Sequence, residues 1–209
     1  MENNPVKTKN VTITSSQKEQ GKEIVNFIAS SNGTKIQNCK NRHFGFKKVI
    51  FKNLSIGGLS MSPNSEKHLQ TIYDIKELLI QSWVIIWIGM NSYKNNEHSI
   101  FVRDLLRLIQ QLLNSGINHK KLFIITPLVR GIDLEIHEHQ VSSFDYLVQK
   151  LRQRGIESMN PYHLFPKSMK DNPKSIFSPK DLKKGDFIHY NGKVRQTLHN
   201  FIGNLIKNL

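Results

Sequence analysis

The stretch Gly185-Asp186-Phe187-Ile188-His189-Tyr190-Asn191 puts an acid and a base on one short segment, directly before the last amphipathic run of the chain. Because Asp186 stands three residues before His189, its carboxylate can hydrogen-bond the imidazole, fix the tautomer and stabilise the imidazolium. The run that follows has apolar residues at helical spacing: Val194, Leu198, Phe201, Ile202 and Leu205. The sequence therefore predicts a loop with acid–base capacity that leads into a final helix.

Upstream of this loop, short apolar runs alternate with stretches of helical periodicity. Trp83-Val84-Ile85-Ile86-Trp87-Ile88, followed by Gly89, is typical of a strand buried on both faces of a sheet. The same patterns predict strands at 23–28, 48–53, 122–126 and 155–159, and helices around 69–79, 101–113, 144–151 and 194–205. Such alternation indicates βαβ crossovers, and hence a three-layer α/β/α sandwich with a central parallel sheet of about five strands.

Length and composition fit one domain. The chain has 209 residues, of which 1–21 are polar and predict a flexible basic N-terminal arm, leaving 22–209 for the folded domain. No apolar run reaches the roughly 18 residues of a transmembrane helix, so no membrane span is expected. The first ten residues lack the apolar core of a secretory signal, so an intracellular location is expected. Cys39 is the single cysteine, which excludes a disulfide within the chain.

Functional groups of a parallel sheet gather at the carboxyl ends of its strands, and three predicted loops there carry suitable residues. Ala29-Ser30-Ser31-Asn32-Gly33-Thr34 offers a serine nucleophile, although Ser-Ser-Asn-Gly is also ordinary turn chemistry. Asn53 to Ser60 contains Gly57 and Gly58, whose backbone N–H groups suit an oxyanion, or simply a flexible loop. Gly89-Met90-Asn91-Ser92 offers an asparagine amide as an oxyanion donor, or an Asx turn.

Taken together, the four loops resemble those of the SGNH hydrolases, also called GDSL-like lipases and esterases, over about residues 22–207. Gly89-Met90-Asn91 resembles the family's Gly-x-Asn block, and Asp186 to His189 resembles its Asp-x-x-His pair. Asn53 to Ser60 is similar to the glycine block, and Leu122 to Pro127 to the strand that ends in Thr-Pro. The order and spacing of the blocks agree jointly, which makes the resemblance more specific than any single motif.

The resemblance implies a serine hydrolase that cleaves a carboxylic ester, acyl or acetyl, of a small molecule, without cofactor or metal. It assigns catalytic roles to Ser31, Asp186 and His189, an oxyanion hole to Gly58 and Asn91, and alternates of these to Ser30 and Gly57. The first block departs from the family's Gly-Asp-Ser, because Ala29-Ser30-Ser31 stands there. This departure puts the activity in doubt more than the fold.

The net charge of +14 leaves a second hypothesis open. A surface so rich in lysine keeps a protein soluble, but it also suits RNA or another polyanion. The alternative function is therefore a catalytically inactive SGNH-like domain that binds RNA or another polyanion, as in Oskar. The survival of Asn91, Asp186 and His189 argues for catalysis. His137-Glu138-His139 is interpreted as a solvated loop rather than a metal site.

Overall fold

The computed structural model describes residues 22–30, 49–55, 76–88, 98–128, 133–185 and 189–208. Its centre is a five-stranded sheet with the strand order β2-β1-β3-β4-β5, in which every neighbouring pair is parallel. The strands are β1 (Glu23–Ala29), β2 (Val49–Asn53), β3 (Trp83–Trp87), β4 (Leu122–Ile125) and β5 (Glu157–Met159). The predicted α/β class and parallel sheet are confirmed.

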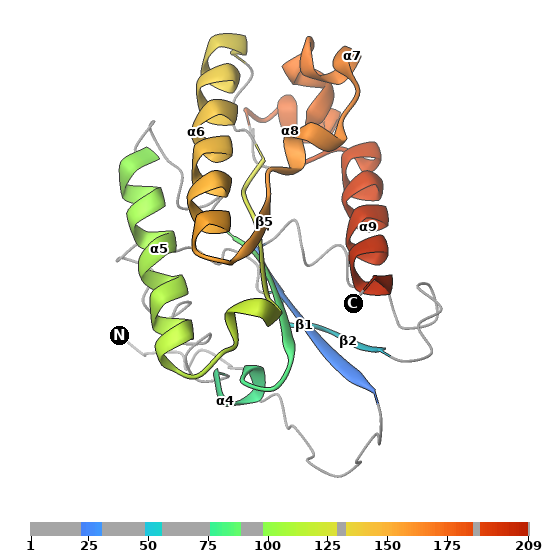
Figure 1. Cartoon of the computed structure of the whole chain (residues 1–209). Coiled ribbons are helices and arrows are strands. Elements are labelled where there is room, and N and C mark those ends of the chain that lie inside the picture. The colour runs from blue at the N-terminus through green and yellow to red at the C-terminus, as the bar shows by residue number, and fades with distance from the viewer. Residues whose placement is uncertain are drawn as a thin grey trace, which may run out of the picture.

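Helices cover both faces of the sheet, as the three-layer prediction required (Figure 1). Their bounds are α4 (Lys76–Leu79), α5 (His98–Asn114), α6 (Leu134–Gln153) and α9 (Gly192–Lys207). Successive strand side chains point to opposite faces: Phe27 and Trp87 pack with α9, whereas Ile28 and Ile86 pack with α5 and α6. Because both sets are buried, the central strands carry the continuous apolar runs seen in the sequence.

Helix α6 begins earlier than the sequence predicted. Its N-cap is Asp133, whose side chain accepts a hydrogen bond from the backbone N–H of Ile136 at 3.1 Å. His137, Glu138 and His139 therefore lie on the first turns of a helix, and their interpretation as a solvated loop was wrong. His137 is fully buried against the rings of Tyr162 and Phe177. His139 is exposed, so the two histidines lie on different sides of α6.

Between β5 and α9 the chain forms a run of short helical turns: the 3-10 helices η4 (Pro161–Leu164) and η5 (Pro173–Ile176), with α7 (Lys167–Lys170) and α8 (Pro179–Leu182). A further 3-10 turn, η3 (His119–Lys121), precedes β4. Figure 1 shows α7 and α8 gathered at the end of the domain where α9 begins, opposite α4. Since this run follows the last residue of β5 and α4 precedes β3, the run lies at the carboxyl edge of the parallel sheet.

Candidate active site at the carboxyl edge of the sheet

The structure describes two of the residues that the sequence singled out, Ser30 and His189. The other candidates lie outside the described residues: Ser31, Gly57, Gly58, Asn91 and Asp186. Ser30 directly follows β1 and its side chain is buried, with 3% exposed. His189 is partly buried and stands three residues before Gly192, the first residue of α9, and two residues before the N-cap Asn191.

The end of β1 lies beside the end of β3. Ala29 is paired with Trp87 in the parallel ladder, and these are the last residues of their strands. After β1 the chain moves to β2 on one side, whereas after β3 it moves to β4 on the other. The β1–β3 boundary is thus the topological switch point, where open α/β sheets hold their ligands. Ser31 is the second residue after β1 in the sequence, and Asn91 the fourth after β3.

His189 is tied to this same boundary through its neighbour Tyr190. The Tyr190 side chain is fully buried, and its ring stacks on that of Trp87 with centroids 6.3 Å apart and planes inclined by 20°. Because Trp87 ends β3, this contact anchors the segment that carries His189 at the carboxyl edge, beside the end of β1. Two chain regions about 160 residues apart in sequence, at Ser30 and at His189, are thus held at one edge.

Backbone contacts hold the same segment from its other side. The N–H of Ser178 donates to the carbonyl of His189 at 3.0 Å, and the N–H of Asn191 donates to the carbonyl of Ile176 at 3.0 Å. Between these two bonds, Phe177 and Tyr190 form an antiparallel bridge, and their rings lie 6.0 Å apart. The His189 segment is therefore fixed to η5 as well as to the sheet.

Asn191 adds a third constraint, because it starts α9. Its side-chain oxygen accepts from the N–H of Val194 at 2.9 Å, and its amide nitrogen donates to the carbonyl of Ser175. Arg195 donates from its guanidinium to the carbonyl of Tyr190 at 2.9 Å. The residue after the candidate base is therefore anchored in the core, and the next one caps a helix. This is the positional precision that an acid–base group requires.

Buried polar atoms without a hydrogen-bond partner among the described residues also lie at this edge. Three buried polar atoms find no partner among the described residues: Ser55 Oγ, Trp87 Nε1 and Thr126 Oγ1. They stand just after β2, at the end of β3 and just after β4. Since a buried polar group without a partner costs about 1–3 kcal/mol, such atoms are uncommon in a folded core. All three atoms lie at the carboxyl edge of the sheet, where the candidate site is expected.

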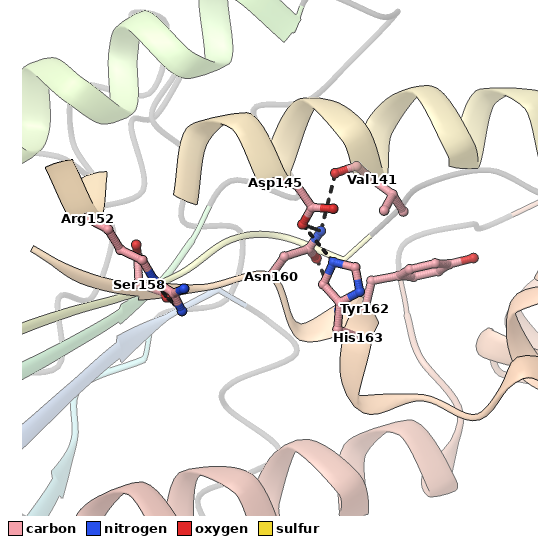
Figure 2. A network of polar contacts seen from close by, with 7 residues as sticks. All are labelled: Val141, Asp145, Arg152, Ser158, Asn160, Tyr162 and His163. Atoms are coloured by element: carbon pink, nitrogen blue, oxygen red, sulfur yellow. Dashed lines mark hydrogen bonds and ion pairs between the residues drawn. The ribbon is translucent and has the colours of Figure 1, made fainter. Parts of the chain in front are cut away.

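A second acid–base pair lies at the end of β5, and sequence reasoning missed it (Figure 2). Asp145 of α6 has its Oδ1 atom 2.7 Å from Nε2 of His163 and 2.9 Å from the amide nitrogen of Asn160. The Asn160 oxygen accepts from the N–H of Tyr162 at 3.1 Å and so caps η4. No spacing rule could have found the pair, because 18 residues separate Asp145 from His163.

This second pair borders an open hollow of about 770 Å³ formed by α6, the end of β5 and η4. The described residues that line the hollow include no serine, threonine or cysteine, so the Asp145–His163 pair has no nucleophile beside it. Arg152 donates two hydrogen bonds to the carbonyl of Ser158, at 2.9 and 3.2 Å, and thereby covers part of the exposed edge of β5. These contacts attach η4 and β5 to α6, which is a structural role.

No group of three His, Cys, Asp or Glu side chains among the described residues is arranged to hold a metal ion. No described helix combines the length and the apolar character that crossing a membrane requires. At the level of sequence, no protein-family model and no curated protein matches the chain.

The fold, by contrast, has clear counterparts among solved structures. A lipase/acylhydrolase from Enterococcus faecalis superposes with a TM-score of 0.61 at 17% identity, covering 89% of this chain and 96% of that one. The esterase EstA from Pseudoalteromonas sp., in a structure inhibited by monoethylphosphonate, gives 0.55 at 16% identity, covering 88% and 99%. The acetyl xylan esterase AlAXEase gives the same four values.

The chain therefore has the same fold as these lipase and esterase structures, which is the α/β fold that the resemblance in the sequence implied. The five-stranded parallel sheet with helices on both faces is the shared feature.

Proposed function

We propose that the chain is a serine hydrolase of the SGNH type that cleaves a carboxylic ester. The observation that carries this proposal is the anchoring of the His189 segment, through Tyr190 and Trp87, at the end of β3 beside the end of β1. A histidine in a segment anchored near the switch point, where open α/β sheets bind their ligands, supports a role for His189 as the general base. The esterase and lipase neighbours support the same reaction class.

In the proposed reaction Ser31 Oγ attacks the acyl carbon while His189 takes the serine proton. Asp186 hydrogen-bonds the imidazole and stabilises its charged form. The N–H groups of Ser31 and Gly58 and the amide of Asn91 receive the oxyanion. The imidazolium then protonates the leaving alcohol, and water, deprotonated by His189, releases the acid and restores the serine.

Ser30 is the weaker candidate for the nucleophile. The residue is 3% exposed, which leaves little of it open to an incoming substrate. Gly57 remains the alternative to Gly58 as an oxyanion donor, because the two are adjacent and both lack a side chain.

The test uses single variants at both serines and at the base. Ser31→Ala and His189→Gln should each lower kcat for a short-chain 4-nitrophenyl ester by at least about 10³-fold, as the loss of a triad member does. Ser31→Ala should also abolish covalent labelling by a fluorophosphonate, whereas Ser30→Ala should keep both labelling and turnover. Circular dichroism on each variant controls for folding.

Two results contradict the proposal in different ways. Labelling that disappears in Ser30→Ala and persists in Ser31→Ala would move the nucleophile by one residue. A wild-type protein that neither turns over short esters nor reacts with the fluorophosphonate would exclude ester hydrolysis. It would leave the non-catalytic, polyanion-binding alternative.

A further inference from the structure

The segment that leads into His189 is strongly basic. We call residues 166–185 the basic segment; it contains α7, η5 and α8. The basic segment contains two aspartates, Asp171 and Asp181, and six lysines. The lysines are Lys167, Lys170, Lys174, Lys180, Lys183 and Lys184. This density of cationic residues is about twice that of the chain, in which 30 of 209 residues are Lys or Arg. Six lysines less two aspartates give the basic segment a net charge of +4, out of +14 for the chain.

These lysines are available to a ligand. Five of the six are exposed, and the sixth, Lys170, is half-buried with its ammonium 5.5 Å from the centre of the Tyr162 ring. None of the six forms an ion pair with a carboxylate in the described part of the chain. Elsewhere a lysine can be neutralised, as Lys121 is by Glu23 at 3.3 Å. Asp171 and Asp181 thus lower the net charge of the basic segment without forming an ion pair with its lysines in the described part of the chain.

The basic segment and the candidate base form one structural unit. The hydrogen bond from Ser178 to His189 and the Phe177–Tyr190 bridge join the middle of the basic segment to the residues directly before α9. Lys183 and Lys184 precede His189 by only a few residues. Figure 1 shows α7 and α8 at the end of the domain where α9 begins, which is the end that carries His189. The basic segment therefore lies at the same end of the domain as the proposed site.

The chemistry of the basic segment favours recognition of charge. Its aromatic residue Phe177 is buried, so the described segment presents no exposed ring on which a nucleic-acid base could stack. Exposed ammonium groups on flexible stems, by contrast, attract anions of many shapes and concentrate them near a site. Such lysines would attract a negatively charged group of the substrate without requiring a particular arrangement of its oxygen atoms.

We propose that the ester hydrolysed at this site carries a negative charge near its scissile bond, and that the basic segment binds that charge. This inference rests on the proposed hydrolase function and names its class of substrate. The anion is a carboxylate or a phosphate, both of which lysine ammonium ions bind as point charges.

The experiment compares two esters of 4-nitrophenol with the same acyl chain length: the glutarate monoester, which ends in a carboxylate, and the neutral pentanoate. Wild-type protein should give a kcat/KM ratio, glutarate over pentanoate, that falls as salt is raised, because salt screens the attraction. The triple variant Lys174→Glu, Lys180→Glu, Lys184→Glu should lower this ratio by about tenfold or more, mainly through KM.

A matched control removes the same charge from the opposite edge of the sheet. Lys22→Glu, Lys120→Glu and Arg154→Glu also replace three exposed cations, at positions just before β1, within η3 and just before β5. Because those positions lie at the amino ends of strands, this triple variant should keep the wild-type ratio to within about twofold.

The outcomes separate the inference from the function on which it rests. Hydrolysis of both esters with a ratio that neither triple variant changes overturns the inference and leaves the hydrolase standing. Equal effects of the two triple variants also overturn it, since net charge alone would then be responsible. A wild-type protein inactive on both esters overturns function and inference together. If the basic-segment variant loses binding of poly(U) RNA while the ester ratio is unchanged, the segment is a nucleic-acid surface instead, and the inference is wrong.

Discussion

Replacement of Tyr190 by leucine should damage catalysis far more than a comparable change elsewhere in the core. Tyr190 is fully buried and its ring contacts two others, Trp87 at 6.3 Å and Phe177 at 6.0 Å. Aromatic pairs contribute about 0.5–1.5 kcal/mol each beyond the apolar area that they bury. With the smaller volume of leucine added, we expect the free energy of unfolding to fall by roughly 2–3 kcal/mol.

The matched control is Phe144→Leu on the other face of the sheet. Phe144 is equally buried, and its ring meets that of Phe101 edge-on at 5.7 Å, so its loss should cost about 1–2 kcal/mol. Urea unfolding followed by circular dichroism measures both changes. Domains of this kind have about 5–15 kcal/mol of stability, so both variants should remain folded.

Activity distinguishes the two variants. Since Tyr190 holds the neighbouring His189, its replacement should lower kcat/KM for a 4-nitrophenyl ester by about tenfold to a hundredfold, the effect of a displacement near 1 Å. Phe144→Leu should stay within about twofold of wild type. If Tyr190→Leu keeps full activity in a folded protein, or if Phe144→Leu loses as much, then the Tyr190–Trp87 contact does not position the base.

Two further predictions concern stability. Burial, with smaller contributions from the carboxylates of Asp171 and Glu138, raises the pKa of Tyr162 above its ordinary value of 10.0. The unfolded chain therefore loses this proton first, so stability should fall as pH rises beyond about 10, and Tyr162→Phe should flatten the fall in urea titrations from about pH 8 to about pH 11. Gly116 has φ of +94° and an added Cβ would lie 4.0 Å from Ile80, so Gly116→Ala should cost about 1–2 kcal/mol through the backbone alone. Gly192→Ala, at the start of α9 with no positive φ and open space around it, should instead be neutral or stabilising, and an equal loss of thermal stability in both variants would contradict this.

The sheet could be predicted because its central strands are buried on both faces. Trp83–Trp87 and Leu122–Ile125 are continuous apolar runs of strand length, which a surface helix would not show. The start of α6 could not be predicted, because there polar side chains are buried and apolar side chains are exposed. His137 and Gln140 are buried, whereas Leu134 and Ile136 are 45% and 36% exposed. Periodicity assigns apolar residues to the core, so it fails where polar side chains fill the interior.

For the site, the sequence predicted the residue types but not what holds them. His189 was singled out by its spacing from Asp186, yet the contacts that hold its segment come from Tyr190, Phe177 and Ser178. None of these has a catalytic signature, since an aromatic residue beside a histidine is ordinary core composition. Only the register of Trp87 with Ala29 reveals that the aromatic contact leads to the end of β1.

Phe177 connects the two proposals. Its ring packs on Tyr190, which anchors the candidate base, while its backbone continues into α8 and the lysines of the basic segment. A base and a charged binding surface that share one buried anchor keep a fixed relation to each other, because neither can shift without disturbing the same aromatic contacts. The backbone of the basic segment would therefore stay near the segment that carries His189, although each lysine side chain can move. This shared anchor is the physical reason to expect that charge selection and ester hydrolysis belong to one site.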